Sequence, residues 1–322
     1  MIKVFVDGQE GTTGLQIHER IALRSDIELL QIDPAKRKDT AERARLLNAA
    51  DVAFLCLPDD AAKESVALVT NPKTIVIDAS TAHRTDSAWA YGLAELSAGH
   101  RKAIACSKRI SNPGCYATGF ALAVAPLVQQ GILPTDANIA CHAASGYSGA
   151  GKKLIAIYEA EGAQISTPGA SLKLFAPRPY ALTLQHKHLP EMRKAAGLNE
   201  IPFFNPEVGP YYKGMYVTIA LFPRMFAKAT DVAGLHAALS AHYAGQQFVR
   251  VMPLDALTSL EGGFLDPTSC NGTNRADIYV FGHESHMQVT VVLDNLGKGA
   301  SGAAVQNMNI ALGLEESLGL NA

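Results

Sequence analysis

The sequence lacks a surplus of charge of either sign. Its 28 lysines and arginines stand against 30 aspartates and glutamates, which gives a formal net charge of −2 over 322 residues. Proteins that bind nucleic acid or an acidic membrane surface draw much of their binding energy from clustered positive charge. The charge balance therefore argues against both classes. Charged residues are 18% and hydrophobic residues 48% of the chain, which favours a globular protein over a disordered chain or a coiled coil.

Long hydrophobic runs are also missing. The longest, residues 119–128, has about half the length that a bilayer-spanning helix needs, and it contains Pro126. Residues 1–7 show neither the basic segment nor the long apolar stretch of a secretory signal. We therefore expect a cytoplasmic protein without a transmembrane helix or a membrane partner.

Cysteine is scarce, and no C-x-x-C pair occurs. The five cysteines are Cys56, Cys106, Cys115, Cys141 and Cys270. An odd number without such a pair argues against a disulfide framework and against a structural zinc site. We therefore expect reduced thiols and no metal. Cys56, Cys106 and Cys141 lie in strand-like apolar runs and are predicted to be core residues.

The first third of the chain contains short apolar runs rich in β-branched residues. They span residues 2–7, 27–32, 51–57 and 74–78, separated by segments of helical length. This alternation predicts an α/β fold with a doubly wound parallel sheet between helices. Later runs at 215–221, 278–281 and 287–293 predict antiparallel strands, because helical segments are absent between the last two. Residues 299–318 predict a final helix.

A glycine-rich loop follows the first of these runs. Gly8, Gly11 and Gly14 form a G-x-x-G-x-x-G pattern that opens a helix. Backbone N–H groups and the positive end of a helix can hold a pyrophosphate there. The pattern in this context predicts a dinucleotide site, although Glu10 places a carboxylate near the phosphates. A merely tight turn is the alternative.

The residues after the second run leave the choice of dinucleotide open. Asp33 lies where a ribose-binding acid belongs, which indicates NAD. Lys36, Arg37 and Lys38 follow at once and could neutralise a 2′-phosphate, which indicates NADP. A third interpretation is a solvated charge cluster at the start of a helix.

Cys115 is the strongest candidate for a reactive group. The stretch SNPGCYAT at 111–118 places a Pro-Gly turn directly before the cysteine and an apolar helix after it, to about residue 130. Aligned peptide dipoles at a helix N-terminus stabilise a thiolate. The pattern therefore predicts a nucleophile rather than a core thiol.

Two histidines and a carboxylate could serve as proton partners for this thiol. His186 and His188 lie on one face of an extended segment, and Glu191 could fix a histidine tautomer. A metal site at the two histidines is the weaker alternative, since no third ligand has suitable spacing. The segment His283–His286 falls one residue short of H-E-x-x-H and is predicted to be a turn.

Two further segments favour an active site at the carboxyl ends of the strands. Arg84 follows the fourth run, where α/β sheets place ligands, and could clamp a carboxylate or phosphate. A surface salt bridge is its alternative role. Residues 145–153, SGYSGAGKK, lack the ending of an ATP-binding phosphate loop and are interpreted as an active-site loop.

An ordered series of motifs extends along nearly the whole chain. It comprises the glycine loop at 8–14, DASTAHRT at 78–85, YGLAEL at 91–96, SNPGCYAT at 111–118, SGYSGAGKK at 145–153, HKHLPE at 186–191 and DNLGKGASGAAVQNMN at 294–309. This series resembles the N-acetyl-γ-glutamyl-phosphate reductases of arginine biosynthesis, in their shorter, type 2 form. The resemblance implies an NADP-binding Rossmann domain at 1–114, completed by a returning helix at 299–322. It also implies an α+β catalytic and oligomerisation domain of the semialdehyde-dehydrogenase type at 115–298.

The resemblance also implies roles for single residues. Cys115 matches the nucleophile, His186 the acid–base and Glu191 the carboxylate that orients it, with the choice between His186 and His188 left open. The implied substrate contacts are Arg84, Asn112, Ser145 and His188. The implied cofactor contacts are Gly8, Gly11, Thr12, Thr13, Gly14, Arg37, Ser80, Asn295, Lys298 and Gly299.

The implied reaction reduces an acyl phosphate with NADPH. The Cys115 thiolate displaces phosphate, hydride reduces the thioester, and a histidine takes the hydroxyl proton as the aldehyde leaves. We expect a small-molecule substrate, no nucleic-acid partner and a homo-oligomer, either a dimer or a tetramer. Aspartate-semialdehyde dehydrogenase is the alternative enzyme, and a nucleotide-sensing protein with an inert Cys115 is the alternative of another class.

Overall fold

The protein, seen here in a computed structural model, is described over residues 1–8, 11–162 and 174–322. It divides into two compact units. Unit 1 comprises Met1–Gly114 and Ala300–Asn321, and unit 2 comprises Cys115–Gly299 and the terminal Ala322. Cys115, the predicted nucleophile, is thus the first residue of unit 2.

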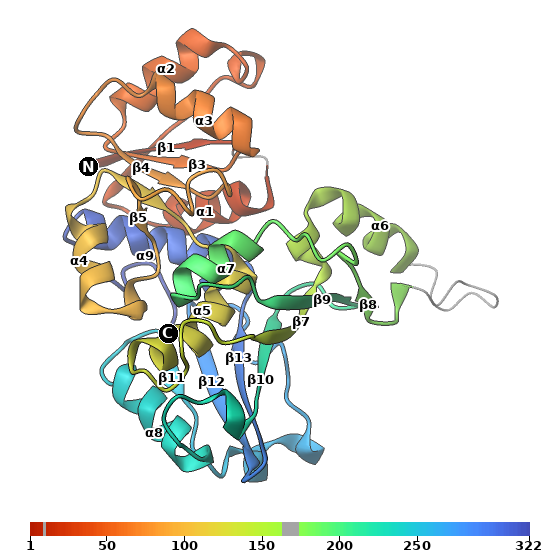
Figure 1. The fold of residues 1–322 in the computed structure, drawn as a ribbon. Helices are drawn as coiled ribbons and strands as arrows, with labels where there is room; N and C mark the ends of the chain where they lie inside the picture. The colour runs from red at the N-terminus through yellow and green to blue at the C-terminus, as the bar shows by residue number, and fades with distance from the viewer. Residues whose placement is uncertain (9–10, 163–173) are drawn as a thin grey trace. The chain divides into compact units, whose positions relative to one another are not determined.

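Unit 1 contains a six-stranded sheet in the order β2-β1-β3-β4-β6-β5 (Figure 1). The strands are β1 (Ile2–Asp7), β2 (Ile27–Leu30), β3 (Val52–Leu55), β4 (Ile75–Asp78), β5 (Ala90–Tyr91) and β6 (Arg109–Ser111). All neighbouring strands are parallel, which confirms the doubly wound sheet expected from the sequence. Their carboxyl ends therefore share one edge, where open α/β sheets bind ligands.

Helices cover both faces of this sheet (Figure 1). Helices α2 (Thr40–Ala49) and α3 (Asp59–Leu68) lie on one face, and α1 (Thr12–Ala22), α4 (Ala98–Cys106) and α9 (Gly302–Ala311) lie on the other. Successive strand residues point to opposite faces. Val4 and Val6 accordingly join the core that includes α1 and α9, whereas Phe5 joins the core that includes α2.

Helix α9 is an integral part of unit 1 although it comes from the end of the chain. Its Ala304, Val305 and Met308 are at most 1% exposed and lie in the core beneath the sheet. Polar contacts add to this: Gln306 Nε2 donates to Glu95 Oε1 at 2.8 Å. The predicted helix at 299–318 exists but is shorter. A π-helical turn at Gly297–Ser301 precedes α9, and Gly313, with φ of +69°, takes the left-handed conformation that ends helices.

Unit 2 contains a mixed sheet of seven strands in the order β11-β12-β13-β10-β7-β9-β8. The strands are β7 (Ala140–Gly146), β8 (Arg178–Pro179), β9 (Phe203–Gly209), β10 (Met215–Leu221), β11 (Val249–Val251), β12 (Ala276–His283) and β13 (His286–Leu293). Strand β13 pairs antiparallel with both β10 and β12, which confirms the antiparallel strands expected from the sequence. The predicted turn at 283–286 joins β12 to β13.

Helix α5 (Cys115–Gln129) is the central helix of unit 2 and contacts β10 and β13. All its residues from Tyr116 to Leu127 are buried. A Cβ on Gly119 would lie 2.6 Å from Val217 Cγ2, so the helix approaches the sheet as closely as a glycine allows. The other helices of unit 2 are α6 (Lys152–Gly162), α7 (Leu189–Ala196) and α8 (Val232–His242).

The cysteines form no disulfide in the described part of the chain. Cys141 in β7 is buried and Cys56 packs partly buried against a core of unit 1, in agreement with the sequence interpretation. The prediction for Cys106 was wrong. It is the last residue of α4 and is exposed, because residues 103–106 form part of an amphipathic helix that buries Ile104 alone.

Among the described helices, none combines the length and the apolar character needed to cross a membrane.

Candidate active site

The glycine loop joins β1 to α1 in unit 1. Gly8 has φ of +88°, and a Cβ there would lie 2.4 Å from the backbone oxygen of Cys56, so only glycine fits. The Gly11 N–H donates to the Gly8 oxygen at 3.0 Å, and α1 begins at Thr12 without an acidic residue in its first turn, which includes Thr13 and Gly14. Gln9 and Glu10 lie outside the described residues. The loop thus presents a helix N-terminus at the carboxyl edge of the sheet, a fit for a dinucleotide pyrophosphate.

Asp33 caps a short 3₁₀-helix at Pro34–Lys36. Its carboxylate accepts a hydrogen bond from the Ala35 N–H at 2.9 Å. The structure therefore gives this carboxylate a local capping role. Lys36, Arg37 and Lys38 are exposed beside it. This basic cluster suits a 2′-phosphate group.

The turn after β4 is organised around a buried carboxylate, Asp78. Asp78 is 0% exposed and accepts hydrogen bonds from the Ser80 N–H at 2.9 Å and the Ser80 hydroxyl at 2.7 Å. His83 Nδ1 lies 2.6 Å from the same carboxylate, and its ring stacks on Trp89 at 4.1 Å. Ser80 was predicted from the sequence, whereas Asp78 and His83 were not.

Arg84 and Asn112 lie together in unit 1. Arg84 Nε donates to the Asn112 backbone oxygen, and Arg84 Nη2 to the Ala79 backbone oxygen, both at 2.9 Å. Arg84 is 8% exposed and Asn112 only 1%. These contacts link the turn after β4 to the loop that leads to Cys115.

Cys115 begins α5, and Tyr116 beside it is buried under an aromatic cluster of unit 2. The Tyr116 ring lies edge-on to His186 and His188, with centroids 5.9 Å apart in each case. The Tyr180 hydroxyl donates to the Tyr116 hydroxyl at 3.1 Å. Burial, followed by Tyr180 and Cys115, raises the pKa of Tyr116 well above its ordinary value, so this phenol stays protonated.

His186 has a defined tautomer in this cluster. Its Nδ1 accepts a hydrogen bond from the His188 N–H at 3.1 Å, so the proton of the neutral ring lies on Nε2. Burial, and secondarily Lys187, lowers the pKa of His186 to about 4. The ring is therefore neutral near pH 7 and can donate one hydrogen bond from Nε2.

His188 and Glu191 belong to the start of α7. His188 is the N-cap residue and is 6% exposed, and Glu191 lies in the first turn and is 2% exposed. The two histidine rings contact each other with centroids 4.8 Å apart. The structure thus brings Tyr116, His186 and His188 into one cluster.

Ser145, Asn295, Lys298 and Gly299 are all parts of unit 2. Asn295 accepts from the Gly214 N–H at 2.8 Å and donates to the Ser148 hydroxyl at 3.0 Å, so it ties the 145–153 loop to the segment after β13. Lys298 is 1% exposed, with Nζ 5.8 Å from the centre of the Phe248 ring. Within the described residues, no three side chains of the metal-binding types form a cluster.

Comparison with known proteins identifies the family to which the chain belongs. The semialdehyde dehydrogenase NAD binding domain matches residues 3–104, and the semialdehyde dehydrogenase dimerisation domain matches residues 115–295. A protein of Nostoc sp. named N-acetyl-gamma-glutamyl-phosphate reductase 2 is 48% identical, with 99% of each chain covered. The chain belongs to the N-acetyl-γ-glutamyl-phosphate reductase family. The reductase of Burkholderia cenocepacia, also 48% identical, covers 96% of this chain and 97% of its own.

Solved structures share the fold of this reductase family at low identity. Aspartate semialdehyde dehydrogenase from Francisella tularensis has a TM-score of 0.72 at 15% identity, and covers 96% of this chain and 99% of its own. The type II enzyme from Vibrio cholerae has a TM-score of 0.71 at 15% identity, covering 97% and 98%. The chain is 45–48% identical to the named reductases but 15% identical to these two dehydrogenases. The higher identity favours the reductase family over aspartate-semialdehyde dehydrogenase, the alternative considered from the sequence.

Sequence reasoning missed the phenol pair of Tyr116 and Tyr180. Tyr116 was treated only as part of the helix after Cys115, and Tyr180 was given no role. The available signal was chain proximity: one tyrosine adjoins the predicted nucleophile and the other precedes the first predicted histidine by six residues. Their mutual contact arises from the pairing of β8 with β9, which no local pattern reveals.

Proposed function

We propose that this protein reduces N-acetyl-γ-glutamyl phosphate to N-acetylglutamate 5-semialdehyde, with NADPH as reductant and phosphate as the leaving group, in arginine biosynthesis. The observation that carries the proposal is Cys115 at the start of the buried helix α5, next to a cluster that holds His186. Relatives with the reductase name at 45–48% identity support the choice of substrate.

Unit 1 supplies the cofactor site. Gly8, Gly11, Thr12, Thr13 and Gly14 form the loop and the N-terminus of α1, where backbone N–H groups would hold the pyrophosphate. Arg37, exposed beyond β2, is the candidate partner of the 2′-phosphate. NADPH supplies a hydride to the acyl carbon when bound.

Cys115 carries the acyl group. Its thiolate attacks the acyl-phosphate carbon, a C–S bond forms, the C–O bond to phosphate breaks, and inorganic phosphate leaves with its electron pair. Backbone N–H groups in the first turn of a helix point out of its N-terminal end, so those of α5 are proposed to donate to the carbonyl oxygen as charge develops on it. The absence of acidic residues from that turn favours the same negative charge.

His186 stabilises the oxyanion of the thiohemiacetal. With Nδ1 engaged by the His188 N–H, the ring donates from Nε2, and its low pKa keeps it neutral while it does so. The oxyanion then collapses to the aldehyde and returns the Cys115 thiolate without a net proton transfer. In this tautomer His186 is a hydrogen-bond donor, whereas the sequence interpretation assigned it proton removal. Glu191 and His188, both buried at the start of α7, are proposed to hold that segment in place.

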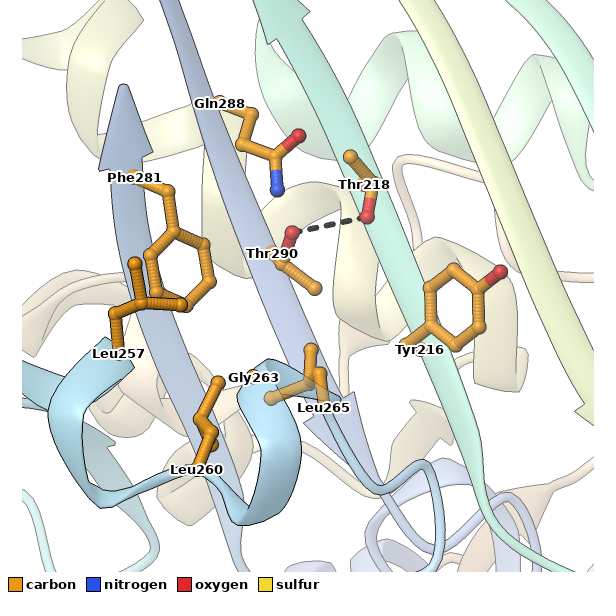
Figure 2. Close-up of a pocket in the computed structure, with 9 residues that line it drawn as sticks. All are labelled: Tyr216, Thr218, Leu257, Leu260, Gly263, Leu265, Phe281, Gln288 and Thr290. Carbon is orange, nitrogen blue, oxygen red and sulfur yellow. Dashed lines mark hydrogen bonds between the residues drawn. The ribbon is translucent and has the colours of Figure 1, made fainter. Parts of the chain in front are cut away.

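A homodimer is proposed to form through the open face of the seven-stranded sheet. The matched dimerisation domain spans this sheet. Figure 2 shows a pocket on it, with Thr218 and Thr290 bonded across two strands at 2.9 Å. Leu257, Leu260 and Leu265 line the same pocket of about 450 Å³. A second copy of the chain would bury these leucines. We further propose a cytoplasmic location, in keeping with biosynthetic relatives and cysteines that form no disulfide.

The reverse reaction tests the proposal: phosphate-dependent reduction of NADP⁺ with N-acetylglutamate semialdehyde. Aspartate semialdehyde and NAD⁺ serve as the competing substrate and cofactor. Cys115→Ala is expected to abolish turnover while NADPH still binds, whereas Cys106→Ala, at an exposed position in α4, leaves turnover unchanged. Full activity of Cys115→Ala would overturn the cysteine mechanism. Preference for aspartate semialdehyde would overturn the substrate.

A further inference from the structure

Asn112 is held by hydrogen bonds from every one of its polar groups. Its N–H donates to the Asp78 oxygen at 2.7 Å, and its backbone oxygen accepts from Arg84 Nε at 2.9 Å. Its side-chain Nδ2 donates to the Ala300 oxygen at 2.9 Å, and its Oδ1 accepts from Asn307 Nδ2 at 3.1 Å. The residue is 1% exposed. Such a side chain is fixed inside the protein, three residues before Cys115.

Two of these partners come from the end of the chain. Ala300 immediately follows Gly299, and Asn307 lies in α9, where its Nδ2 also donates to the Gly92 oxygen at 2.9 Å. The amide of Asn112 therefore fastens the loop before Cys115 to the chain segment that enters α9. The chain passes from unit 1 to unit 2 at 114–115 and back at 299–300, so both positions are close in sequence to residues of this hydrogen-bonded link.

Gly299 makes a corresponding contact within unit 2. A Cβ on Gly299 would lie 2.7 Å from the Cβ of Cys115, 3.1 Å from Leu293 Cδ1 and 3.2 Å from the Asp294 oxygen. The Gly299 N–H donates to that Asp294 oxygen at 2.9 Å in the π-helical turn. The backbone of this turn therefore lies directly against the nucleophile, and any larger residue would displace one of them. π-helical turns of this kind occur frequently at functional sites.

We propose that Asn112 and Gly299 are positioning residues for Cys115, each acting through contacts within its own unit. Asn112 fixes the loop before the cysteine, and Gly299 gives its side chain the space it occupies. The sequence interpretation gave the two residues substrate and cofactor contacts instead. The new assignment rests on the proposed function for its effect on turnover, but not for its effect on the thiol itself.

Gly299→Ala tests the space beside the nucleophile. Because the added methyl group would displace the Cys115 side chain, we expect kcat to fall about 100-fold, with the KM for the acyl substrate and the Kd for NADPH changed less than threefold. Gly119→Ala is the matched control, since its Cβ would meet Val217 Cγ2 at 2.6 Å in the same helix, away from Cys115. Equal losses of kcat in the two variants would overturn the assignment.

Asn112→Ala tests the fastening of the loop. We expect a similar fall in kcat, with NADPH affinity retained and a smaller loss in Asn112→Asp, which keeps the acceptor for Asn307. Asn309→Ala is the control. Asn309 is buried like Asn112, but it lies in α9 and forms hydrogen bonds with Arg24 and with backbone oxygens of the C-terminal loop. If Asn309→Ala loses as much turnover as Asn112→Ala, general destabilisation explains the effect and the assignment fails.

A substrate-free measurement separates this inference from the proposed function. The iodoacetamide alkylation rate of Cys115, read by peptide mass spectrometry with the exposed Cys106 as internal reference, is expected to change at least threefold in Gly299→Ala and Asn112→Ala only. Wild-type protein without reductase activity, but with this pattern of alkylation, would reject the function and retain the positioning role. Unchanged alkylation and unchanged kcat in both variants would reject the positioning role.

Discussion

At the scale of one residue, the surroundings of His186 determine both its tautomer and its charge. A hydrogen bond from the His188 N–H fixes which ring nitrogen carries the proton, and burial keeps the ring neutral. Both effects come from a segment of three residues and the side chains that cover it. The sequence shows the two histidines and the carboxylate, but not which nitrogen faces the backbone, because the tautomer depends on dihedral angles that alternation alone leaves undetermined.

The lowered pKa of His186 predicts a pH-dependent contribution to stability. The unfolded chain takes up a proton near pH 6.5, whereas the folded chain does so only near pH 4. Since the unfolded state binds more protons in this interval, the free energy of unfolding falls as the pH drops from 6.5 to 4. His186→Gln should remove that part of the decrease, as measured by urea unfolding at pH 7 and pH 5. Identical pH dependence in the variant and the wild type would contradict it.

Gly8 predicts a coupled loss of stability and cofactor binding. Gly8→Ala places a Cβ 2.4 Å from the Cys56 oxygen at a φ of +88°, so the loop must move. We expect a loss of about 1–3 kcal/mol in the free energy of unfolding and weaker NADPH binding, measured by denaturation and by fluorescence titration. Gly99→Ala, whose Cβ would meet only Ser97 Oγ at 3.4 Å, is the control. Wild-type NADPH affinity in Gly8→Ala would refute the role of the loop.

At the scale of elements, periodicity predicted strands well and the ends of helices poorly. The runs at 2–7 and 215–221 match β1 and β10 in full, because apolar side chains repeat along each strand. The final helix was predicted too long. The segment contains several glycines, and the sequence does not show that Gly313 is the one that takes the left-handed conformation and ends the helix. Cys106 was misassigned because a short apolar run fits either a strand or one face of a helix.

The element-scale prediction concerns α9. Met308 is 0% exposed in the core of unit 1, so Met308→Ala should cost about 2–5 kcal/mol in the free energy of unfolding. Leu318→Ala, at a position 39% exposed, should change it by about 0.5 kcal/mol or less. Urea denaturation with and without NADPH measures both. Equal effects of the two substitutions would show that α9 is not part of the core.

The candidate site shows which contacts a sequence can reveal. Cys115 and the glycine loop are local patterns, a turn followed by a helix, and the sequence identifies them directly. The contacts of Asn112 and Gly299 are not local patterns, because their partners lie up to 195 positions away in the sequence. These contacts depend on how the last segment returns to unit 1. Their identity was visible in the motifs, but their contacts required the tertiary structure.

At the scale of the whole molecule, the open sheet face predicts the state of association. Leu257 lines the pocket in Figure 2 and is 57% exposed. If the proposed dimer forms through this face, Leu257→Asp should shift it towards monomer in sedimentation velocity, because a buried carboxylate without a partner opposes association. Leu23→Asp, at a position 89% exposed in unit 1, should leave the dimer intact. An unchanged dimer in Leu257→Asp would place the interface elsewhere.

The discontinuity of unit 1 sets an order for folding during synthesis. A ribosome delivers chains from the N-terminus, and domains generally fold as they emerge. Unit 2 lies within Cys115–Gly299 apart from the last residue, so almost all of it can fold while the chain is still growing. Unit 1 has to wait for residues 300–321, although its first strand is made before anything else. The nucleotide-binding unit is therefore the last to be completed, and a chain released early would carry Cys115, the proposed nucleophile, without the helix that finishes that unit.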